Sequence, residues 1–307
     1  MSLLVVGSVA LDSVETPFGI REEVLGGSAT FFSTSASFFN PVKLVAVVGE
    51  DFPEAHVNFL KSRGVGLEGL TREKGRTFRW KGKYGFQLNE AQTLDTQLNV
   101  FQSFSPRLPE SYRDAPYVFL GNIHPELQSQ VLDQVKGPRL VAADTMNFWI
   151  TGSRPALLNT LKRVNLLFVN DAEARQLSGE HNILKAARAI LGMGPSRVVI
   201  KRGEYGALLI EREHVFSCPA MPLEDVFDPT GAGDTFAGGF MGTLATADRQ
   251  ERDVLRRAMV MGSVMASFTV EKFSLDRLRG LTQREIHQRF SEFKRLTHFD
   301  DLGPLEG

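Results

Sequence analysis

The chain of 307 residues has little cysteine and little histidine: one cysteine, Cys218, and six histidines. A single cysteine permits no intrachain disulfide and no thiolate metal cluster. The histidines show no His-x-x-His or similar spacing, which disfavours a transition-metal site. Proteins without disulfides are typical of reducing compartments, so we expect a cytoplasmic setting.

The sequence also lacks an excess of charge and lacks long apolar runs. Lys and Arg number 35 against 36 Asp and Glu. This balance gives no electrostatic reason to expect nucleic acid or an anionic membrane as partner. No apolar run approaches the ~18 residues that span a bilayer. The opening residues MSLLVVG lack a basic leader and predict a first buried strand. These features predict a globular protein of one large α/β domain, with or without a small appendage.

Familiar nucleotide and nucleophile signatures are missing as well. There is no G-x-x-x-x-G-K-[ST] loop, and no G-x-G-x-x-G follows the first apolar run. There is no G-x-S-x-G elbow either. P-loop nucleoside triphosphatases and NAD-dependent enzymes are therefore disfavoured.

What the chain does have is a regular alternation of short apolar runs and helical patterns. This alternation predicts a Rossmann-like, three-layer α/β fold, with a mainly parallel sheet covered on both faces. Strands are expected at 3–9, 42–48, 117–121, 139–144, 166–170, 197–202 and 207–211. Two stretches, 13–25 and 76–101, break the rhythm, and their patterns favour antiparallel strands apart from the main sheet. They could form a small β lid over the strand ends or an ordinary edge hairpin.

The most distinctive stretch is DPTGAGD at residues 228–234. Pro229 fixes one backbone dihedral, and Gly231 and Gly233 permit a tight turn with amides directed outward. A helical pattern follows at once, so these amides should lie at a helix N-terminus, where they attract anions. Asp234 could be a plain helix cap. It could also take a proton from a hydroxyl beside a phosphate, although the helix dipole should make it a weak base.

Polar residues follow the ends of several expected strands, which is where open α/β sheets bind ligands. Asp12 follows the first strand and Lys201 lies at the end of the sixth. Asn170 and Glu173, three apart after the fifth strand, could hold a hydrated Mg²⁺, although capping explains Asn170 as well. Lys201 could be solvated, or could contact a nucleotide phosphate as a point charge.

These residues together resemble the PfkB, or ribokinase-like, carbohydrate and nucleoside kinases. DPTGAGD followed by TFAGGF is similar to the C-terminal signature of that family, and Gly26-Gly27 before a Ser/Ala/Phe helix is similar to its first signature. Asp12, NDAE at 170–173 and KRG at 201–203 follow the family's order. The resemblance covers nearly the whole chain. It implies one kinase domain over residues 1–307, with a lid formed by about 13–25 and 76–101.

The resemblance implies an ATP-dependent kinase that uses Mg²⁺ and phosphorylates a hydroxyl of a small acceptor. Asp234 would be the catalytic base, and the amides of Gly231, Ala232 and Gly233 would form the anion hole. The other implied roles are acceptor binding by Asp12, Gly26, Gly27 and Asp234; nucleotide binding by Asn170, Glu173, Lys201, Gly203, Gly231, Gly233 and Gly262, with adenine near 262–268; Mg²⁺ held through water by Asn170 and Glu173; and a monovalent cation such as K⁺ at Asp228 and Thr230.

The acceptor stays open between a sugar, a sugar phosphate, a cyclitol and a nucleoside. Aromatic side chains at Phe31, Phe32 and Trp80 could stack on a base or belong to the core. Basic residues at 76, 79, 81 and 83 could bind a phosphate or form a solvated face. Ser28 stands where sugar kinases of the family often have Asn, which puts acceptor contacts from that helix in doubt. A non-catalytic nucleotide or sugar sensor is the alternative of another class, and an exposed lid edge could pair two chains as a homodimer.

Overall fold

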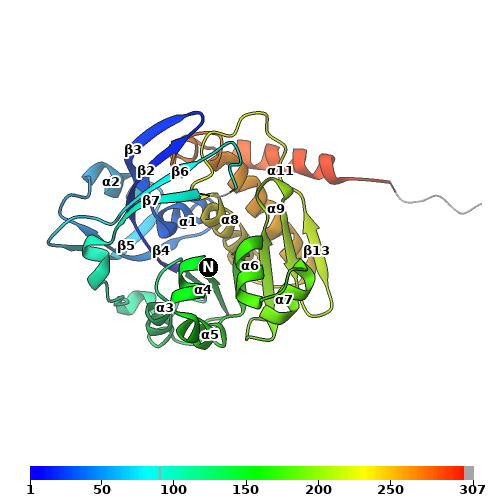
Figure 1. Ribbon diagram of the computed structural model, residues 1–307, viewed down its shortest axis with the longest axis horizontal. Helices are drawn as coiled ribbons and strands as arrows, with labels where there is room; N and C mark the ends of the chain where they lie inside the picture. The colour runs from blue at the N-terminus through cyan, green and yellow to red at the C-terminus, as the bar shows by residue number, and fades with distance from the viewer. Residues whose placement is uncertain (90, 301–307) are drawn as a thin grey trace, which may run out of the picture.

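The computed structural model describes residues 1–89 and 91–300, which form two separate β-sheets flanked by helices (Figure 1). The larger sheet has the strand order β13-β12-β11-β10-β9-β8-β1-β4-β5. Its strands in chain order are β1 (Leu3–Val6), β4 (Val42–Gly49), β5 (Val65–Glu73), β8 (Tyr117–Leu120), β9 (Leu140–Asp144), β10 (Leu166–Asn170), β11 (Arg197–Lys201), β12 (Ala207–Ile210) and β13 (Val215–Cys218).

The larger sheet is parallel from β5 to β11, and β12 and β13 then add to it in antiparallel pairing. Its central strands are buried on both faces, as the apolar runs predict: all four residues of β1 are 0% exposed. The predicted strands are confirmed. Strands β5 and β13 were not predicted, because the glycines and charges of VGLEGLTRE and the exposed residues of β13 hide them among loops.

Helices cover both faces of this sheet and give the predicted three-layer architecture. One hydrophobic core joins the sheet to the N-terminal and C-terminal helices, and a second joins the other face to the helices of the middle of the chain. The first group is α1 (Ser28–Ala36), α2 (Glu54–Ser62), α8 (Ala232–Ala247), α9 (Arg252–Thr269), α10 (Asp276–Arg279) and α11 (Gln283–Thr297); the second is α3 (Pro125–Leu132), α4 (Asn147–Gly152), α5 (Arg154–Leu161), α6 (Asp171–Ser178) and α7 (Ile183–Leu191).

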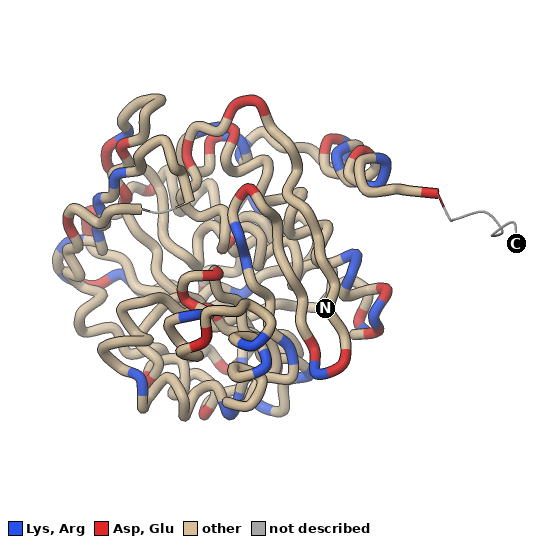
Figure 2. The backbone as a smooth tube through the Cα atoms, turned by 45° about the vertical axis from the view of Figure 1, so that its right-hand side comes forward, with Lys and Arg blue, Asp and Glu red and all other residues tan. Residues whose placement is uncertain are grey.

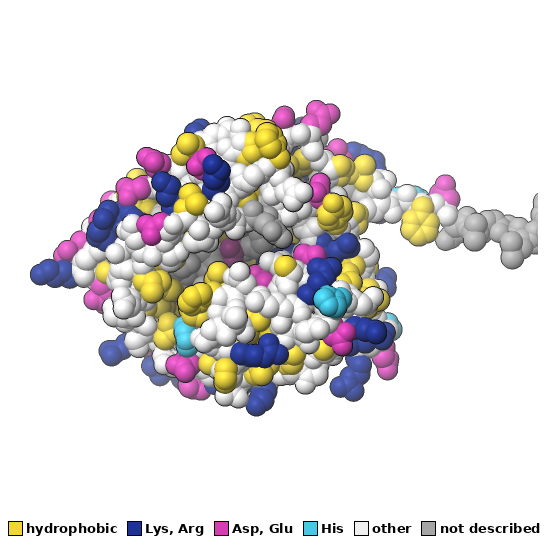
Figure 3. All heavy atoms as spheres, viewed as in Figure 1, with side chains coloured by type: hydrophobic (Ala, Val, Ile, Leu, Met, Phe, Trp, Pro, Cys, Tyr) yellow, Lys and Arg dark blue, Asp and Glu magenta, His cyan; other side chains and the backbone are white. Residues whose placement is uncertain are grey.

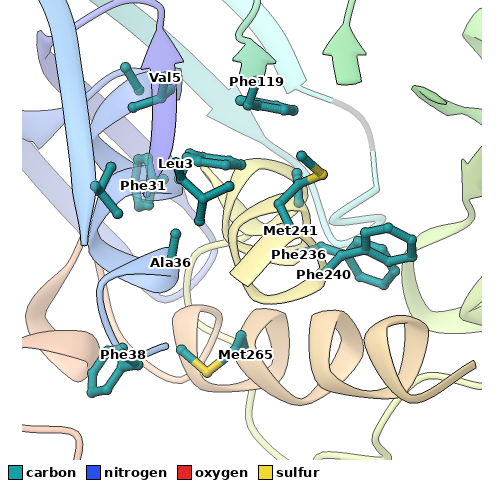
Figure 4. Close-up of a cluster of buried hydrophobic side chains, with 14 of the residues drawn as sticks. Leu3, Val5, Phe31, Ala36, Phe38, Phe119, Phe236, Phe240, Met241 and Met265 are labelled. Atoms are coloured by element: carbon teal, nitrogen blue, oxygen red, sulfur yellow. The ribbon is translucent and has the colours of Figure 1, made fainter. Parts of the chain in front are cut away.

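Helix α8 is the centre of the first core, with Phe236, Phe240 and Met241 packed against side chains of the sheet, α1 and α9 (Figure 4). Its glycines allow this close packing. A Cβ added to Gly238 would lie 2.6 Å from the carbonyl oxygen of Phe32 in α1, and one added to Gly239 would lie 2.8 Å from Met265 of α9. Neighbouring helices on two sides therefore fix the position of α8.

The smaller sheet has the order β3-β2-β6-β7 and contains β2 (Ala10–Thr16), β3 (Gly19–Gly26), β6 (Arg79–Tyr84) and β7 (Ala91–Gln97). A separate small sheet is as predicted, but the purely antiparallel pairing was wrong, because β2 and β6 pair in parallel. The reason is topological: β2 follows β1 and β6 follows β5, and these two strands of the main sheet run in the same direction. The small sheet lies over one edge of the molecule (Figure 1).

The Thr-x-x-Glu pattern at residues 282–285 predicts a capping box, and helix α11 begins with one, in which Thr282 and Glu285 exchange hydrogen bonds. Its buried face, with Ile286 and Phe293, packs on α9 in a further outer layer, rather than directly on the sheet. Among the helices that the structure describes, none is long and apolar enough to cross a membrane.

Candidate active site

The turn before α8 has the geometry that its glycine demands. Gly231 has φ 73°, and a Cβ at this position would lie 2.3 Å from the ring of Phe31, so only glycine fits. The amide of Thr230 donates to Asp228 Oδ1 over 2.9 Å, and the amide of Ala232 donates to the carbonyl oxygen of Pro229 over 3.1 Å. These two hydrogen bonds close a compact turn, here called the 228–231 turn.

Three amides at the start of α8 are left for a ligand. Within residues 1–89 and 91–300, the N–H groups of Gly231, Gly233 and Asp234 donate to no other group. The sequence assigned Ala232 to this group, and the structure corrects that assignment, since its amide closes the turn. Free amides at a helix N-terminus form an anion site.

Asp234 lies in the first turn of α8 beside these amides. Burial raises the pKa of its carboxyl, the nearby Asp144 carboxylate raises it further, and Lys201 opposes both. The expectation of a weakened base was therefore wrong in direction. The helix dipole alone would lower the pKa, but removal from water outweighs it.

Lys201 joins this group from the sheet. It ends β11 and Asp144 ends β9, so the two residues flank β10, and Lys201 Nζ lies 2.7 Å from Asp144 Oδ2. The same ammonium lies against Gly233, where an added Cβ would be 2.9 Å from Nζ. Lys201 thus lies between a carboxylate and the anion site. A bound phosphate would meet a positive charge already held in place.

Asn170 and Glu173 lie at the start of α6 and cap it. Glu173 N donates to Asn170 Oδ1 over 2.7 Å, and Asn170 N donates to Glu173 Oε2 over 2.8 Å. The capping interpretation of Asn170 is confirmed. Burial raises the pKa of Glu173, Asp144 raises it further, and Lys201 lowers it. Glu173 therefore belongs to the same electrostatic cluster as Asp144 and Lys201.

Asp12 lies in β2 of the small sheet, directly opposite the start of α1. Its Oδ2 accepts a hydrogen bond from Gly27 N over 3.3 Å, and an added Cβ on Gly26 would lie 1.9 Å from that oxygen. Burial raises the pKa of Asp12 to about 7, and the charges of Asp228 and Asp234 contribute in the same direction. The Asp12 carboxyl therefore lies near residues of both sequence signatures, the Gly26-Gly27 pair and the DPTGAGD stretch.

Asp228 is the first residue of the 228–231 turn and is 1% exposed. Its Oδ1 accepts from Thr230 N and its Oδ2 accepts from Ser274 N, each over 2.9 Å. Burial raises the pKa of Asp228, while these hydrogen bonds lower it. In the described part of the chain, neither Asp228 nor Asp12 forms an ion pair with a basic side chain.

The space-filling view shows a hollow between the side of the small sheet and the helices opposite, with acidic side chains visible inside it (Figure 3). Elsewhere, acidic and basic residues alternate along the backbone, and no face in the view of Figure 2 carries a single sign of charge.

Comparison with known proteins agrees with this site. Residues 126–277 match the pfkB family of carbohydrate kinases. A cytidine kinase of Thermococcus kodakarensis is 33% identical over 252 residues, which are 78% of this chain and 87% of that relative. The chain belongs to the PfkB family. It is an ATP-dependent kinase that transfers a phosphoryl group to a hydroxyl of a small acceptor.

Solved structures show the ribokinase-like fold of this PfkB kinase. The nucleoside kinase of Methanocaldococcus jannaschii has a TM-score of 0.75 at 20% identity and covers 95% of this chain and 98% of its own. The aminoimidazole riboside kinase of Salmonella enterica has a TM-score of 0.74 at 20% identity, over 94% and 100%. An E. coli protein of this fold, solved with ATP and Mg²⁺, has a TM-score of 0.76 at 17% identity, over 96% and 99%. Kinases of this family use ATP with Mg²⁺.

The residues of this PfkB kinase fit Mg²⁺ as a partly hydrated ion. Carboxylate oxygens are the ligands that Mg²⁺ prefers, and Glu173 and Asp144 supply them beside the anion site. The described residues contain no group of three or more Asp, Glu, His or Cys arranged to hold a metal. Water and phosphate oxygens would therefore complete its coordination, which is usual for Mg²⁺.

Two predicted nucleotide contacts, Gly262 and Gly203, lie in different surroundings. Gly262 is buried inside α9, where an added Cβ would lie 2.9 Å from the carbonyl oxygen of Phe236, so the lack of a side chain there serves helix packing. Its nucleotide contact stays a prediction. Gly203, with φ 54°, begins a 3-10 turn after β11 and stays a prediction. Asn89, from the connection between β6 and β7, lies on Gly203, where an added Cβ would be 1.8 Å from Asn89 Oδ1. The small sheet thus reaches the predicted nucleotide side of the site.

Two residues of the site carried no prediction from the sequence. Asp144 was noted only as the end of a strand, and its pairing with Lys201 depends on the order of β9, β10 and β11. Tyr84 lay within an alternating aromatic stretch, and its hydroxyl lies 3.3 Å from Thr230 Oγ1. No sequence signal marks a contact between residues 146 positions apart.

Proposed function

We propose that this kinase phosphorylates a hydroxyl of a nucleoside. The observation that carries the proposal is an aromatic surface beside the acceptor carboxylate. Trp80 in β6 and Asp12 in β2 are register partners, so their side chains share one face of the small sheet. The Trp80 indole lies along Gly82, where an added Cβ would be 2.0 Å from the ring, and its Nε1 donates to Thr93 Oγ1 over 3.2 Å. A base could stack on this ring while Asp12 binds ribose hydroxyls.

Two further observations support a nucleoside over a free sugar. The relative that is 33% identical to this chain, over an alignment that covers 78% of it, is a cytidine kinase. Ser28, which replaces the Asn frequent in sugar kinases, is 9% exposed and directs its hydroxyl toward Ser8, with the two Oγ atoms 3.2 Å apart. The Ser28 hydroxyl therefore bonds within the protein instead of being directed toward an acceptor.

The catalytic roles follow from the geometry of the site. Phosphoryl transfer needs in-line positioning and stabilisation of charge on the transferring group more than covalent help. In this proposal the free amides of Gly231, Gly233 and Asp234 hold the transferring phosphoryl group, Lys201 holds a neighbouring phosphate, and the Asp234 carboxylate accepts the hydroxyl proton. Asp12 with Gly26 and Gly27 holds the acceptor.

Mg²⁺ would neutralise charge on the ATP phosphates, held through water by Asn170 and Glu173 with Asp144 close by. The capping box keeps Asn170 and Glu173 fixed relative to each other, so a water-mediated contact would be preorganised. We propose that residues 1–307 form one domain in which the small sheet is the lid. A closed lid would exclude water and limit wasteful ATP hydrolysis.

The function is tested by ATP consumption with a panel of nucleosides, pentoses, hexoses, their phosphates and inositols. A nucleoside should be the best acceptor. Trp80→Ala should raise KM for that nucleoside about 10-fold or more, on the scale of one base–aromatic stack. Trp80→Phe, which retains a ring, should raise it much less. A best acceptor without a base, or an unchanged KM in Trp80→Ala, would contradict the proposal.

We also propose a monovalent cation such as K⁺ near Asp228 and Thr230. Asp228 is a buried carboxylate without a basic partner in the described residues, and a cation would offset its charge. Turnover should then rise several-fold when K⁺ replaces tetramethylammonium at equal ionic strength.

The outer strands of the small sheet could pair two chains. Strand β7 is exposed along its whole length, and half of the residues of β3 are exposed. Open strand edges of this kind are sites for pairing with another sheet. Sedimentation equilibrium should give the mass of two chains, and cell fractionation should place them in the cytoplasm.

A further inference from the structure

The small sheet is tied to the 228–231 turn at two points. From β6, the Tyr84 hydroxyl reaches Thr230 Oγ1 over 3.3 Å. From β3, the carbonyl oxygen of Leu25 accepts from Ser274 Oγ over 2.5 Å, and Ser274 N in turn donates to Asp228 Oδ2. The turn that presents the anion-hole amides is therefore held between two strands of the small sheet.

The Tyr84 ring is fixed by packing, so the position of its hydroxyl is defined. Tyr84 is 8% exposed and lies with Val14 of β2 and Phe273 in a small separate hydrophobic cluster. Burial raises the pKa of Tyr84, and the carboxylates of Asp228 and Asp12 add to this shift, so its hydroxyl stays protonated. The Thr230 hydroxyl donates to the oxygen of this fixed phenol.

Thr230 is well placed to transmit this contact. It precedes Gly231, whose left-handed backbone directs the amides of the anion hole, and its own amide is held by Asp228. Its hydroxyl donates to the Tyr84 hydroxyl oxygen, and its side chain also interacts with Asp228, where it lowers the pKa of that carboxyl. Loss of the bond to Tyr84 would leave the turn held from the Asp228 side alone.

We propose that Tyr84 is a positioning residue that couples the small sheet to the anion hole through Thr230. When the small sheet is docked, the Tyr84 hydroxyl holds the turn in the conformation that stabilises the transferring phosphoryl group. When the small sheet moves away, the same motion releases the turn. The proposal rests on the proposed roles of the turn and the small sheet, and does not depend on which acceptor is used.

The test is a double-mutant cycle. Tyr84→Phe keeps the ring and removes the hydroxyl, and should lower kcat about 3- to 10-fold, the scale of one lost hydrogen bond, with KM for ATP within about twofold. Thr230→Val should lower kcat at least as much, and the double variant should lose no more than Thr230→Val alone, because Tyr84 acts through the Thr230 hydroxyl. Thr230→Ser keeps a hydroxyl and should retain most of the wild-type kcat.

Slow ATP hydrolysis without acceptor provides a second readout, because water uses the same anion hole. It should fall by the same factor in Tyr84→Phe. Tyr117→Phe is the matched control: it removes a tyrosine hydroxyl that bonds to Asp248 at the C-terminal end of α8, away from the turn, and should leave kcat unchanged. Multiplicative losses in the double variant, or a kcat unchanged in Tyr84→Phe, would overturn the proposal. If a sugar rather than a nucleoside proves to be the acceptor, the nucleoside proposal fails, while the Tyr84 factor is measured with that sugar and by hydrolysis.

Discussion

Asp234→Ala is expected to lower kcat by at least ~10²-fold while ATP affinity stays within about twofold, the scale of lost acid–base help. Asp234 lies beside free amides at the start of α8, so the carboxylate can meet the hydroxyl proton without holding the nucleotide itself. Steady-state kinetics and calorimetric ATP binding would measure the two effects separately. Asp253→Ala is the matched control, since Asp253 lies in the first turn of α9 and pairs with Arg257 on the surface.

The dependence of kcat on pH should reflect the ionisation of the Asp234 carboxyl. A raised pKa means that Asp234 becomes an ionised base only above the usual carboxylate range of ~4, so kcat should rise with pH beyond that range. For the free enzyme, kcat/KM should rise through about pH 7, because Asp12 also ionises there. Turnover near the wild-type value in Asp234→Ala, or a rising limb near pH 4, would remove Asp234 from its proposed role.

Lys201→Met should raise KM for ATP at least ~10-fold, because a charged hydrogen bond to phosphate is lost. It should also destabilise the fold. The side chains of Asp144 and Lys201 are 7% and 18% exposed, so removal of the lysine leaves a nearly buried carboxylate without its partner. Breaking a buried pair costs about 3 kcal/mol or more, and the residual exposure places this pair at the lower end. Chemical denaturation and ATP titration would measure the two losses.

A second substitution separates stability from function. Asp144→Asn in the Lys201→Met background removes the unpaired charge, so most of the lost stability should return while KM for ATP stays high. Lys185→Met, an exposed lysine on α7, controls for the loss of a lysine. If the double variant were no more stable than Lys201→Met, the ion pair would not be the source of the destabilisation.

The parts of this structure that follow from local chemistry could be predicted from the sequence. Alternating apolar runs predicted the parallel sheet, the glycines of DPTGAGD predicted the turn, and Thr282 with Glu285 predicted a helix start. Each depends on residues within a few positions of one another.

The features that could not be predicted from the sequence depend on residues far apart in the chain. The amide of Ala232 closes the turn only because the Pro229 carbonyl faces it, and Gly262 is buried only because α8 crosses α9 there. The prediction that Asp234 would be a weak base had the wrong direction. Burial raises the pKa of its carboxyl, and this burial is set by the whole site and not by the helix that carries the residue. The parallel pairing of β2 and β6 follows from the order of strands in the main sheet.

The close packing at the glycines of α8 has a consequence for how this enzyme loses activity on heating. Gly238 and Gly239 bring α1 and α9 against the same helix whose first turn carries Asp234, so the catalytic end of α8 is an extension of the main hydrophobic core. Many enzymes lose activity on heating before they unfold, because their active sites lie on loosely held loops. In this kinase the proposed base, Asp234, is carried by a helix that the core holds in place, so we expect it to keep its position while the core is intact. Inactivation and unfolding should therefore share a single transition, and core mutations that lower stability should leave the surviving folded molecules fully active.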